Sequence, residues 1–312
     1  MLRSIITPIL FAAMSVQTLA SPVTVESCNR QVTFDKVPTR AASNDVNLTE
    51  MMLVLGLEDH MVGYTGISGW NKLDAKMRES VAELPELSPR YPTKEVLIGA
   101  DLDFWFAGWN YGMRVGGEVT PETLAAFDIA VYELTESCVH IMPRKNISMA
   151  DMYNDIRNLG IIFKVEDRAE KLIADWKTQL IDITTSISGS STPQVFIYDS
   201  GEDSPFTAGK YAMPTAMIEA AGGKNIMDDI DSSWTKVAWE PVIDRNPEVI
   251  VIVNYGKVTA EQKIAFLKQQ PALSSMDAVI NNRFVVLEYV EATPGPRNID
   301  AIKKLAKAFH NK

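Results

Sequence analysis

Residues 107–117, with the sequence AGWNYGMRVGG, contain side chains suited to holding a large organic molecule. The segment carries Trp109, Tyr111 and Arg114 among four glycines. Aromatic rings can stack on a planar ligand, and an arginine can donate charge-assisted hydrogen bonds to an anionic one. Because the segment directly follows an apolar run predicted as a strand, we expect a loop that presents these three side chains to a large planar or anionic ligand. The alternative is a loop that packs against its own domain.

Other aromatic and basic residues are further candidates, and several of them follow predicted strands. The candidate ligand contacts among them are Trp70, Tyr211, Trp234, Tyr255, Tyr289 and Arg297. Each aromatic residue could equally belong to the core. Arg297, like Arg144, either meets an anionic ligand or forms a salt bridge at the surface.

Sequence patterns typical of catalysis or of a metal site are missing from the chain. It has neither the Gly-x-Ser-x-Gly pattern of a nucleophile elbow nor a GxxxxGK[ST] phosphate loop. It also lacks CxxC and HxxxH spacings, and we expect His60, His140 and His310 to be surface or capping residues. We therefore assign no catalytic residue and no metal ligand, and expect a binding protein rather than an enzyme.

The first 20 residues have the three-part pattern of a cleavable signal peptide. A basic start at Arg3 precedes a mostly apolar run over 5–16, and Thr18 and Ala20 place small residues at the −3 and −1 positions of a cut before Ser21. A lipid anchor would need cysteine immediately after the cut. We therefore expect a free protein in the periplasm, the alternative being that residues 1–20 form a buried first strand or helix.

The charge of the chain argues against one class of partner, and its cysteines fit an exported protein. The chain has a formal net charge of −10 and no basic block, which makes it a poor nucleic-acid binder. Its two cysteines, Cys28 and Cys138, would enter an oxidising compartment, where such a pair can form a disulfide. Two buried free thiols are the alternative.

Short apolar runs alternate with helical runs on both sides of one long helix. Strands are predicted at 40–43, 61–64, 103–107, 129–134, 194–198, 249–253 and 284–287. Helices are predicted at 48–55, 96–98, 121–127, 149–163, 213–221, 259–269 and 299–309. Such alternation favours α/β structure with mainly parallel sheets. The long helix starts at Asp167, with Glu170 completing a capping box, and carries one apolar stripe to Ile187.

This pattern predicts two Rossmann-like lobes, each with a mainly parallel sheet, bridged by the long helix. The expected divisions are a signal peptide (1–20), an N-terminal lobe (21–164), an interlobe helix (165–189) and a C-terminal lobe (190–312). Ligands of open α/β sheets bind beyond the carboxyl ends of the strands. Two lobes can bring these ends face to face, so we expect a ligand cleft between them.

Seven segments, in this order and spacing, resemble class III (cluster A, helical-backbone) periplasmic substrate-binding proteins of ABC importers. They are FDKVPTRAAS (34–43), LTEMMLVLGLEDHMVGY (48–64), KEVLIGADLDFWFA (94–107), DIRNLGIIFKVEDRAEKLIADW (155–176), AGGKNIMDDI (221–230), WEPVIDRNPEVIVI (239–252) and PALSSMDAVINNRFVVL (271–287). The resemblance covers essentially the whole mature chain, although no single segment is a strong marker. The family includes binders of ferric siderophores, haem and vitamin B12.

The resemblance implies partners as well as a fold. It implies a membrane permease with a cytoplasmic ATPase, and a surface glutamate on each lobe that contacts permease arginines. The matching positions are Glu95 and Glu240. Alternatively, both are ordinary acidic residues favoured at helix starts by the helix dipole. We expect the protein to act as a monomer.

Among the ligands of the family, a ferric siderophore matches these residues best, because arginines and aromatics recognise it and Arg114 lies near Trp109 and Tyr111. Vitamin B12 or another corrinoid comes second, since it suits an aromatic cleft but needs no arginine. Haem would want an axial ligand such as Tyr111 or Tyr211. We expect no intrinsic cofactor, with iron present only inside a bound siderophore. An extracytoplasmic sensor domain or an enzyme are remote alternatives.

Overall fold

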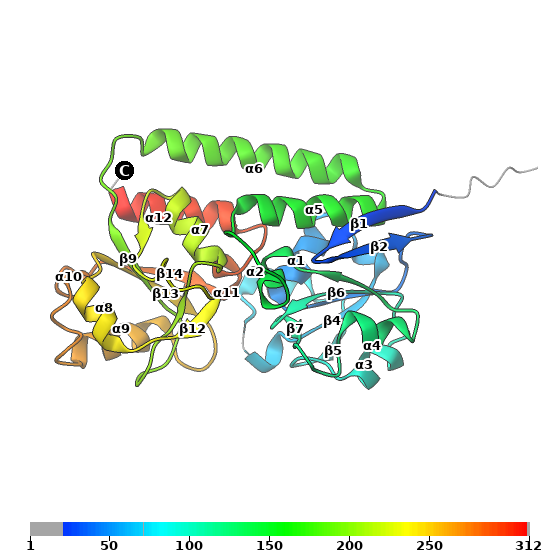
Figure 1. The fold of residues 1–312 in the computed structure, drawn as a ribbon, viewed down its shortest axis with the longest axis horizontal. Helices are drawn as coiled ribbons and strands as arrows, with labels where there is room; N and C mark the ends of the chain where they lie inside the picture. The colour runs from blue at the N-terminus through cyan, green and yellow to red at the C-terminus, as the bar shows by residue number, and fades with distance from the viewer. Residues whose placement is uncertain (1–20, 71, 311–312) are drawn as a thin grey trace, which may run out of the picture.

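Two separate parallel sheets organise the chain in the computed structural model, which describes residues 21–70 and 72–310 (Figure 1). The first sheet contains β3 (Ala41–Asn44), β4 (Met61–Thr65), β5 (Glu86–Ser88), β6 (Phe104–Trp109), β7 (Gly112–Met113) and β8 (Ala130–Glu133). The second has the order β11-β9-β13-β14, with β9 (Gln194–Tyr198), β11 (Lys224–Asn225), β13 (Val249–Asn254) and β14 (Phe284–Glu288). The predicted two-lobe α/β fold is confirmed. The predicted signal peptide lies outside the described residues.

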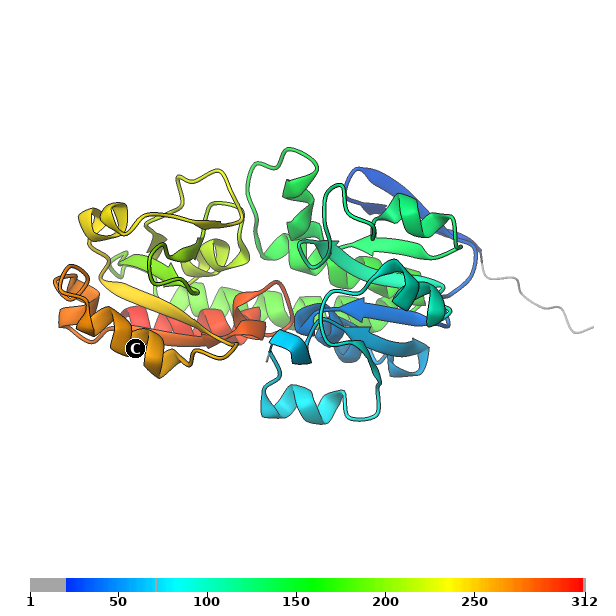
Figure 2. The same cartoon turned by 90° about the horizontal axis from the view of Figure 1, so that it is seen from below.

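Helix α6 (Glu166–Ser186) runs along both lobes and packs on α5 (Met149–Phe163) and on α12 (Asn298–His310) (Figure 1). Its buried residues, Ala169, Ile173, Trp176 and Ile183, belong to the apolar stripe read from the sequence. Figure 2 shows the two lobes side by side with α6 behind them. One long helix thus spans both halves of the molecule.

The start of α6 differs from the prediction. The helix begins at Glu166 after Val165, and no side chain caps its first turn. Asp167 therefore lies inside the helix, and the predicted capping box with Glu170 is wrong. Glu170 instead pairs with Arg157 of α5 at 2.5 Å, which ties the two helices together at the surface.

Several short elements complete the lobes. The remaining helices are α1 (Val46–Val54), α2 (Ala75–Ser80), α3 (Lys94–Gly99), α4 (Pro121–Ala125), α7 (Met213–Ala220), α8 (Trp239–Arg245), α9 (Ala260–Gln269), α10 (Asp277–Ile280) and α11 (Tyr289–Ala292). Antiparallel pairs join β1 (Val23–Ser27) to β2 (Arg30–Phe34) and β10 (Phe206–Ala208) to β12 (Trp234–Lys236). Short 3₁₀ helices are η1 (Glu58–His60), η2 (Ser68–Trp70) and η3 (Thr135–His140). Within 21–70 and 72–310, no helix is both long and apolar enough to cross a membrane.

Candidate functional site

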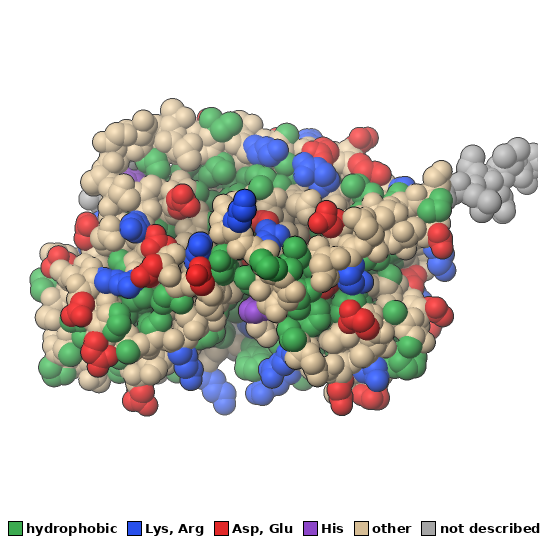
Figure 3. Space-filling view, in the orientation of Figure 1, with side chains coloured by type: hydrophobic (Ala, Val, Ile, Leu, Met, Phe, Trp, Pro, Cys, Tyr) green, Lys and Arg blue, Asp and Glu red, His purple; other side chains and the backbone are tan. Residues whose placement is uncertain are grey.

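A cavity of about 320 Å³ lies between the two lobes, and both lobes line it. Figure 3 shows the molecule hollowed between the lobes, with lysine and arginine side chains on both sides of the lower opening. Seven aromatic residues line the cavity: Trp70, Tyr91, Tyr111, Phe206, Trp234, Tyr255 and Tyr289. Several lining residues directly follow the carboxyl ends of strands, as Asp199 follows β9 and Tyr255 follows β13. This is where open α/β sheets bind their ligands.

The structure brings most of the predicted ligand contacts together in this cleft. Trp70, Tyr111, Arg114 and Trp234 line it, as do Tyr255 and Tyr289. The predicted loop after 103–107 is partly strand, because β6 continues to Trp109 and a tight turn leads into β7. That turn points Tyr111 into the cleft while leaving Arg114 exposed at its edge.

Trp109 and Tyr211 lie outside the cleft, contrary to the sequence prediction. Trp109 is the last residue of β6; its side chain is buried in the core of the N-terminal lobe, and its Nε1 donates to Glu133 Oε1 at 2.8 Å. Tyr211 is half-buried against the C-terminal lobe, and its hydroxyl donates to Asp231 Oδ1 at 3.2 Å. Both aromatic residues are therefore structural rather than ligand-facing.

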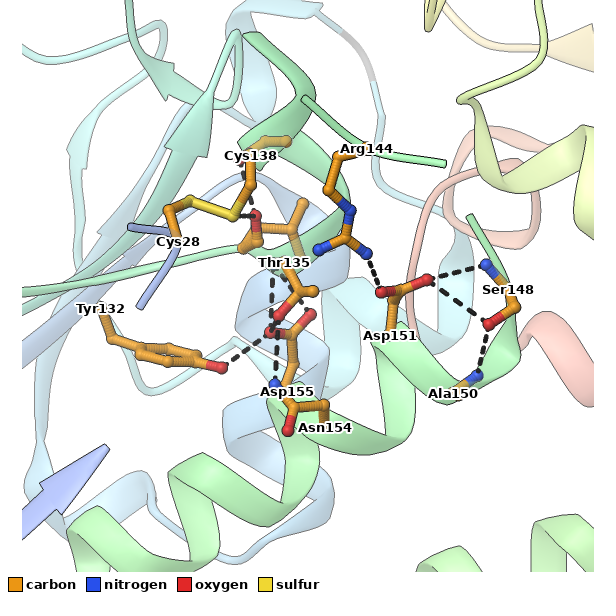
Figure 4. A network of polar contacts seen from close by, with 12 residues as sticks. Cys28, Tyr132, Thr135, Cys138, Arg144, Ser148, Ala150, Asp151, Asn154 and Asp155 are labelled. Carbon is orange, nitrogen blue, oxygen red and sulfur yellow. Dashed lines mark hydrogen bonds and ion pairs between the residues drawn. A yellow bond between two sulfur atoms is a disulfide. The ribbon is translucent and has the colours of Figure 1, made fainter. Parts of the chain in front are cut away.

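Arg297 is also not a cleft residue, because carboxylates of the other lobe hold it. Its Nε donates to Glu50 Oε1 at 2.7 Å, and its Nη1 pairs with Asp74. The Glu50 side chain is 8% exposed, so this ion pair is largely shielded from water. Arg144, the other arginine considered for an anionic ligand, pairs with Asp151 at the start of α5 (Figure 4). In this arrangement both arginines form ion pairs with carboxylates of the protein.

A buried ion pair occupies the floor of the cleft. Lys72 Nζ lies 2.5 Å from Asp45 Oδ2, and the hydroxyl of Tyr289 donates to the same oxygen at 3.0 Å. Lys72 Nζ also lies 4.1 Å from the centroid of the Tyr289 ring. Asp45 precedes α1 with φ of 74°, a left-handed conformation that costs roughly 1–3 kcal/mol in a residue with a side chain. This strained acid is held by partners from both lobes.

Asp199 is the acidic group of the C-terminal wall. Its Oδ1 accepts hydrogen bonds from Ser200 Oγ at 2.7 Å and from the Tyr255 hydroxyl at 2.9 Å. Lys263 Nζ lies beside it but donates to the backbone oxygens of Asp199 and Val253, at 2.5 and 2.6 Å. Burial raises the pKa of Asp199, because the charged carboxylate loses water. Sequence reasoning missed this residue, although it is the first polar position after an apolar strand.

The wall on the N-terminal lobe includes η3, which a disulfide and a buried carboxylate hold in place (Figure 4). A disulfide joins Cys138 of η3 to Cys28, with the two Cα atoms 5.3 Å apart. At the start of η3, the buried carboxylate of Asp155 accepts from the Thr135 backbone N–H at 3.1 Å and from the Tyr132 hydroxyl at 2.8 Å. The two cysteines of the exported-protein hypothesis are therefore bonded in the structure, and the bond fixes one wall of the cleft.

His140, at the end of η3, is half-buried and lines the cleft, a position that the sequence did not predict. Its Nε2 lies 3.2 Å from Asn110 Nδ2, and burial lowers its pKa. His310 does act as a cap, since its Nε2 lies 2.9 Å from the carbonyl oxygen of Ala221 at the end of α7. His60 contacts the Pro38 carbonyl oxygen at 2.7 Å.

Glu136 of η3 connects the two lobes beside the cleft. Its Oε1 accepts a hydrogen bond of 2.8 Å from the backbone N–H of Met213, the first residue of α7. The side chain is buried, and burial raises the pKa of Glu136 to about 7. Burial also raises the pKa of Asp155 to about 7. Two carboxyl groups near the cleft thus take up protons near neutral pH.

Replacing Glu136 by glutamine should flatten the pH dependence of stability. A carboxyl group whose pKa is raised on folding stabilises the fold at low pH, and this contribution is lost as the pH rises from about 4.5 to about 7. Glutamine keeps an oxygen for Met213 and does not titrate. In urea unfolding between pH 4.5 and 8, the free energy of unfolding should therefore decline less steeply for Glu136→Gln, the change being at most about 1.4 kcal/mol per pH unit. Exposed Glu83→Gln is the control, and identical slopes for all three proteins would contradict the prediction.

Comparisons with known proteins agree with this geometry. Residues 117–290 match the family model described as periplasmic binding protein. The chain is 25% identical over 300 residues to the uncharacterised ABC transporter substrate-binding lipoprotein YvrC of Bacillus subtilis, covering 94% of this chain and 87% of the relative. It is 23% identical over 296 residues to a cobalamin-binding protein of Halobacterium salinarum, covering 93% and 74%.

A solved structure extends the match to the fold of nearly the whole chain. A periplasmic binding protein from Veillonella parvula superposes with a TM-score of 0.82 at 28% identity, covering 94% of this chain and 99% of that one. The family match, the two lobes and the helix that spans them lead to one conclusion. The chain belongs to the periplasmic binding protein family, within its helical-backbone class III, whose members are the substrate-binding components of ABC transporters.

Proposed function

We propose that this protein captures a ferric siderophore complex in the cleft and delivers it to the permease of an ABC importer. The observation that carries the proposal is Arg114 at the edge of an aromatic wall. Its guanidinium carbon lies 6.0 Å from the ring centroid of Tyr91, and no carboxylate of the described chain forms an ion pair with it. An exposed arginine beside aromatic rings suits an anionic chelate with apolar faces. Basic side chains on both sides of the opening would attract such a ligand (Figure 3).

In this proposal the protein supplies shape and charge, and the siderophore supplies the iron ligands. The cavity of about 320 Å³ is at the lower end of the range for ligand pockets, so a large chelate would fill it and project through the opening. No cofactor of the protein's own is required. Iron enters and leaves only inside the bound complex.

The test is a titration of the purified protein followed by tryptophan fluorescence, because Trp70 and Trp234 line the cleft. The panel contains ferric hydroxamate and ferric catecholate siderophores, cobalamin and haem. We expect binding of a ferric siderophore, and an affinity about tenfold lower in Arg114→Gln, since hydrogen bonds to charged groups contribute about 1.5–3 kcal/mol. Exposed Arg78→Gln is the matched control. Failure of every ferric siderophore to bind would overturn the proposal.

A corrinoid is the second candidate, and the name of the Halobacterium salinarum relative favours it. The aromatic lining suits stacking on a corrin as well as on a siderophore. The two candidates differ at Arg114, because a corrinoid without net charge gains less from a guanidinium than an anionic chelate does. Tight cobalamin binding that is unchanged in Arg114→Gln would therefore select the corrinoid.

Delivery to a permease requires docking, for which Glu95 and Glu240 are the proposed contacts. Both are exposed, Glu95 in the first turn of α3 and Glu240 in the first turn of α8, one on each lobe. The pKa of Glu95 is lowered by its own backbone N–H and by the Thr93 side chain, so it stays charged at neutral pH. Two such charges can report the separation of the lobes to two cationic pockets.

Reversing both charges, in Glu95→Lys with Glu240→Lys, should abolish uptake while leaving ligand affinity unchanged. Exposed rim charges govern encounter and orientation more than the binding of a ligand elsewhere. Uptake is measured with radiolabelled ligand in cells that lack the native protein, with exposed Glu83→Lys as control. Normal uptake by the double variant would exclude these residues as docking contacts. Uptake independent of the whole protein would instead favour a sensor without a transporter.

The proposal also includes a location. We expect export through residues 1–20, followed by action as a monomer in the periplasm. The Bacillus subtilis relative is named a lipoprotein, whereas Ser21 follows the proposed cut here. Mass spectrometry of the mature protein distinguishes a free N-terminus at Ser21 from a lipid-modified one.

A further inference from the structure

We infer that the C-terminal wall of the cleft selects for a ligand that carries a cationic amino group, which the carboxylate of Asp199 accepts. The inference deepens the proposed function and rests on it, because it specifies which kind of ferric siderophore fits. It concerns a residue on the wall opposite Arg114, and so predicts how the ligand is oriented.

The first observation is that one carboxylate oxygen of Asp199, Oδ2, receives no hydrogen bond from the described residues. Asp199 is 4% exposed and lines the cavity. Ser200 and Tyr255 both donate to its Oδ1. No donor from residues 21–70 or 72–310 reaches its Oδ2 within hydrogen-bonding distance, and that atom is not among the fully enclosed ones. A nearly buried carboxylate with a bare oxygen at a cavity is costly unless a donor arrives from the cavity.

The second observation is that the two lysines nearest to Asp199 are already engaged. Lys263 donates to two backbone carbonyl oxygens, although its charge lies close enough to favour the ionised form of Asp199. Lys72 forms its ion pair with Asp45. No ion pair of the described chain includes Asp199. The carboxylate is therefore available for a cation brought by the ligand.

The third observation is an aromatic pair on the same wall. Phe206 and Trp234 are stacked with ring centroids 5.9 Å apart, and both line the cavity. Their negative ring faces attract an organic cation. Lys263 lies 5.1 Å from the Tyr255 centroid and Lys72 lies 4.1 Å from that of Tyr289. No lysine or arginine of the described segments is placed in this way over Phe206 or Trp234.

A carboxylate oxygen and an aromatic pair that no lysine or arginine of the described segments covers, on one wall of the cleft, have the chemistry that recognises an alkylammonium group. The ammonium donates hydrogen bonds to the carboxylate, while its methylene groups pack on the rings. Arg114 on the other wall is suited to the oxygen-rich part of the chelate. A ligand with an amino group at one end would thus bind in one orientation, with that end at Asp199 and the chelate at Arg114.

The experiment compares two ferric trihydroxamates that coordinate iron alike. Ferrioxamine B is linear and ends in an ammonium group, whereas ferrioxamine E is cyclic and uncharged. We expect the wild-type protein to bind ferrioxamine B about tenfold more tightly than ferrioxamine E, as expected for a hydrogen bond to a charged group. Asp199→Asn should lose this preference. Asp231→Asn removes a carboxylate outside the cavity and should keep it.

A second comparison does not depend on the variant folding. N-acetylation of ferrioxamine B removes its charge and keeps the linear chain, so the wild-type affinity should fall about tenfold. Equal affinity for the acetylated and free forms, or a preference unchanged in folded Asp199→Asn, would overturn the inference alone. Binding of neither ferrioxamine, with tight binding of cobalamin or haem, would overturn the proposed function and the inference with it.

Discussion

Replacing Asp45 by alanine should lower the free energy of unfolding by about 3–5 kcal/mol, the usual cost of leaving a buried charge without its partner. The Lys72 side chain is only 5% exposed and forms its ion pair with Asp45. The substitution also removes the acceptor of the Tyr289 hydroxyl and of the Val46 backbone N–H. Urea unfolding at neutral pH measures the loss, with exposed Asp35→Ala as the control.

A double variant separates the lost ion pair from other effects of the substitution. Replacing Lys72 by methionine together with Asp45→Ala removes both charges, and an apolar pair often costs little or nothing relative to a buried ion pair. The double variant should therefore be more stable than Asp45→Ala alone. We expect both variants to bind the ligand less tightly than the wild type, because each of them changes the floor of the cleft. If Asp45→Ala lowers the free energy of unfolding by less than about 1 kcal/mol, the prediction is wrong, because water then solvates the Lys72 ammonium group.

Removing the disulfide should cost about 2–5 kcal/mol of stability. Cys28 and Cys138 are 110 residues apart, so the bond restricts a long loop in the unfolded chain. The variant Cys28→Ser with Cys138→Ser should unfold at lower urea concentration, and a reductant should destabilise the wild type but not the variant. Ligand affinity should also fall, because the bond anchors the η3 segment that carries Glu136 and His140. Equal midpoints for reduced and oxidised wild type would contradict the prediction.

The sequence predicted the elements whose hydrophobic pattern and ends are both clear. Helix α5 has its predicted bounds because Ser148 caps its first turn and Phe163 ends its apolar face. Strand β9 also has its predicted bounds, being a short apolar run after Pro193. The hairpin of β1 and β2 was not predicted, although its residues alternate between buried and exposed. The short pair of β10 and β12 depends on a contact between distant segments, which local patterns do not encode.

The site was predicted where residues follow strand ends and missed where contacts are non-local. Tyr255 was found because it follows the predicted strand at 249–253, whereas Trp234 was proposed only as a further aromatic residue. Trp109 was misplaced because strand β6 runs further than its apolar core suggested. Arg297 was misplaced because its partner Glu50 lies 247 residues earlier in the chain. Lys72 was missed for a similar reason, since nothing near it in sequence marks it as the partner of a strained aspartate.

Some contacts of the N-terminal lobe can form only after the end of the chain has been synthesised. Three acidic residues of that lobe accept hydrogen bonds from residues near the end of the chain. Asp45 accepts from Tyr289, which lies 244 residues later. Glu50 and Asp74 accept from Arg297, which lies 247 and 223 residues later. Synthesis proceeds from the N-terminus, so a nascent chain exposes these carboxylates long before their partners exist. The N-terminal lobe therefore lacks these three contacts until residues 289–297 have been made. We expect a truncated product that ends before Tyr289 to be more open to proteolysis, because these carboxylates then lack their partners.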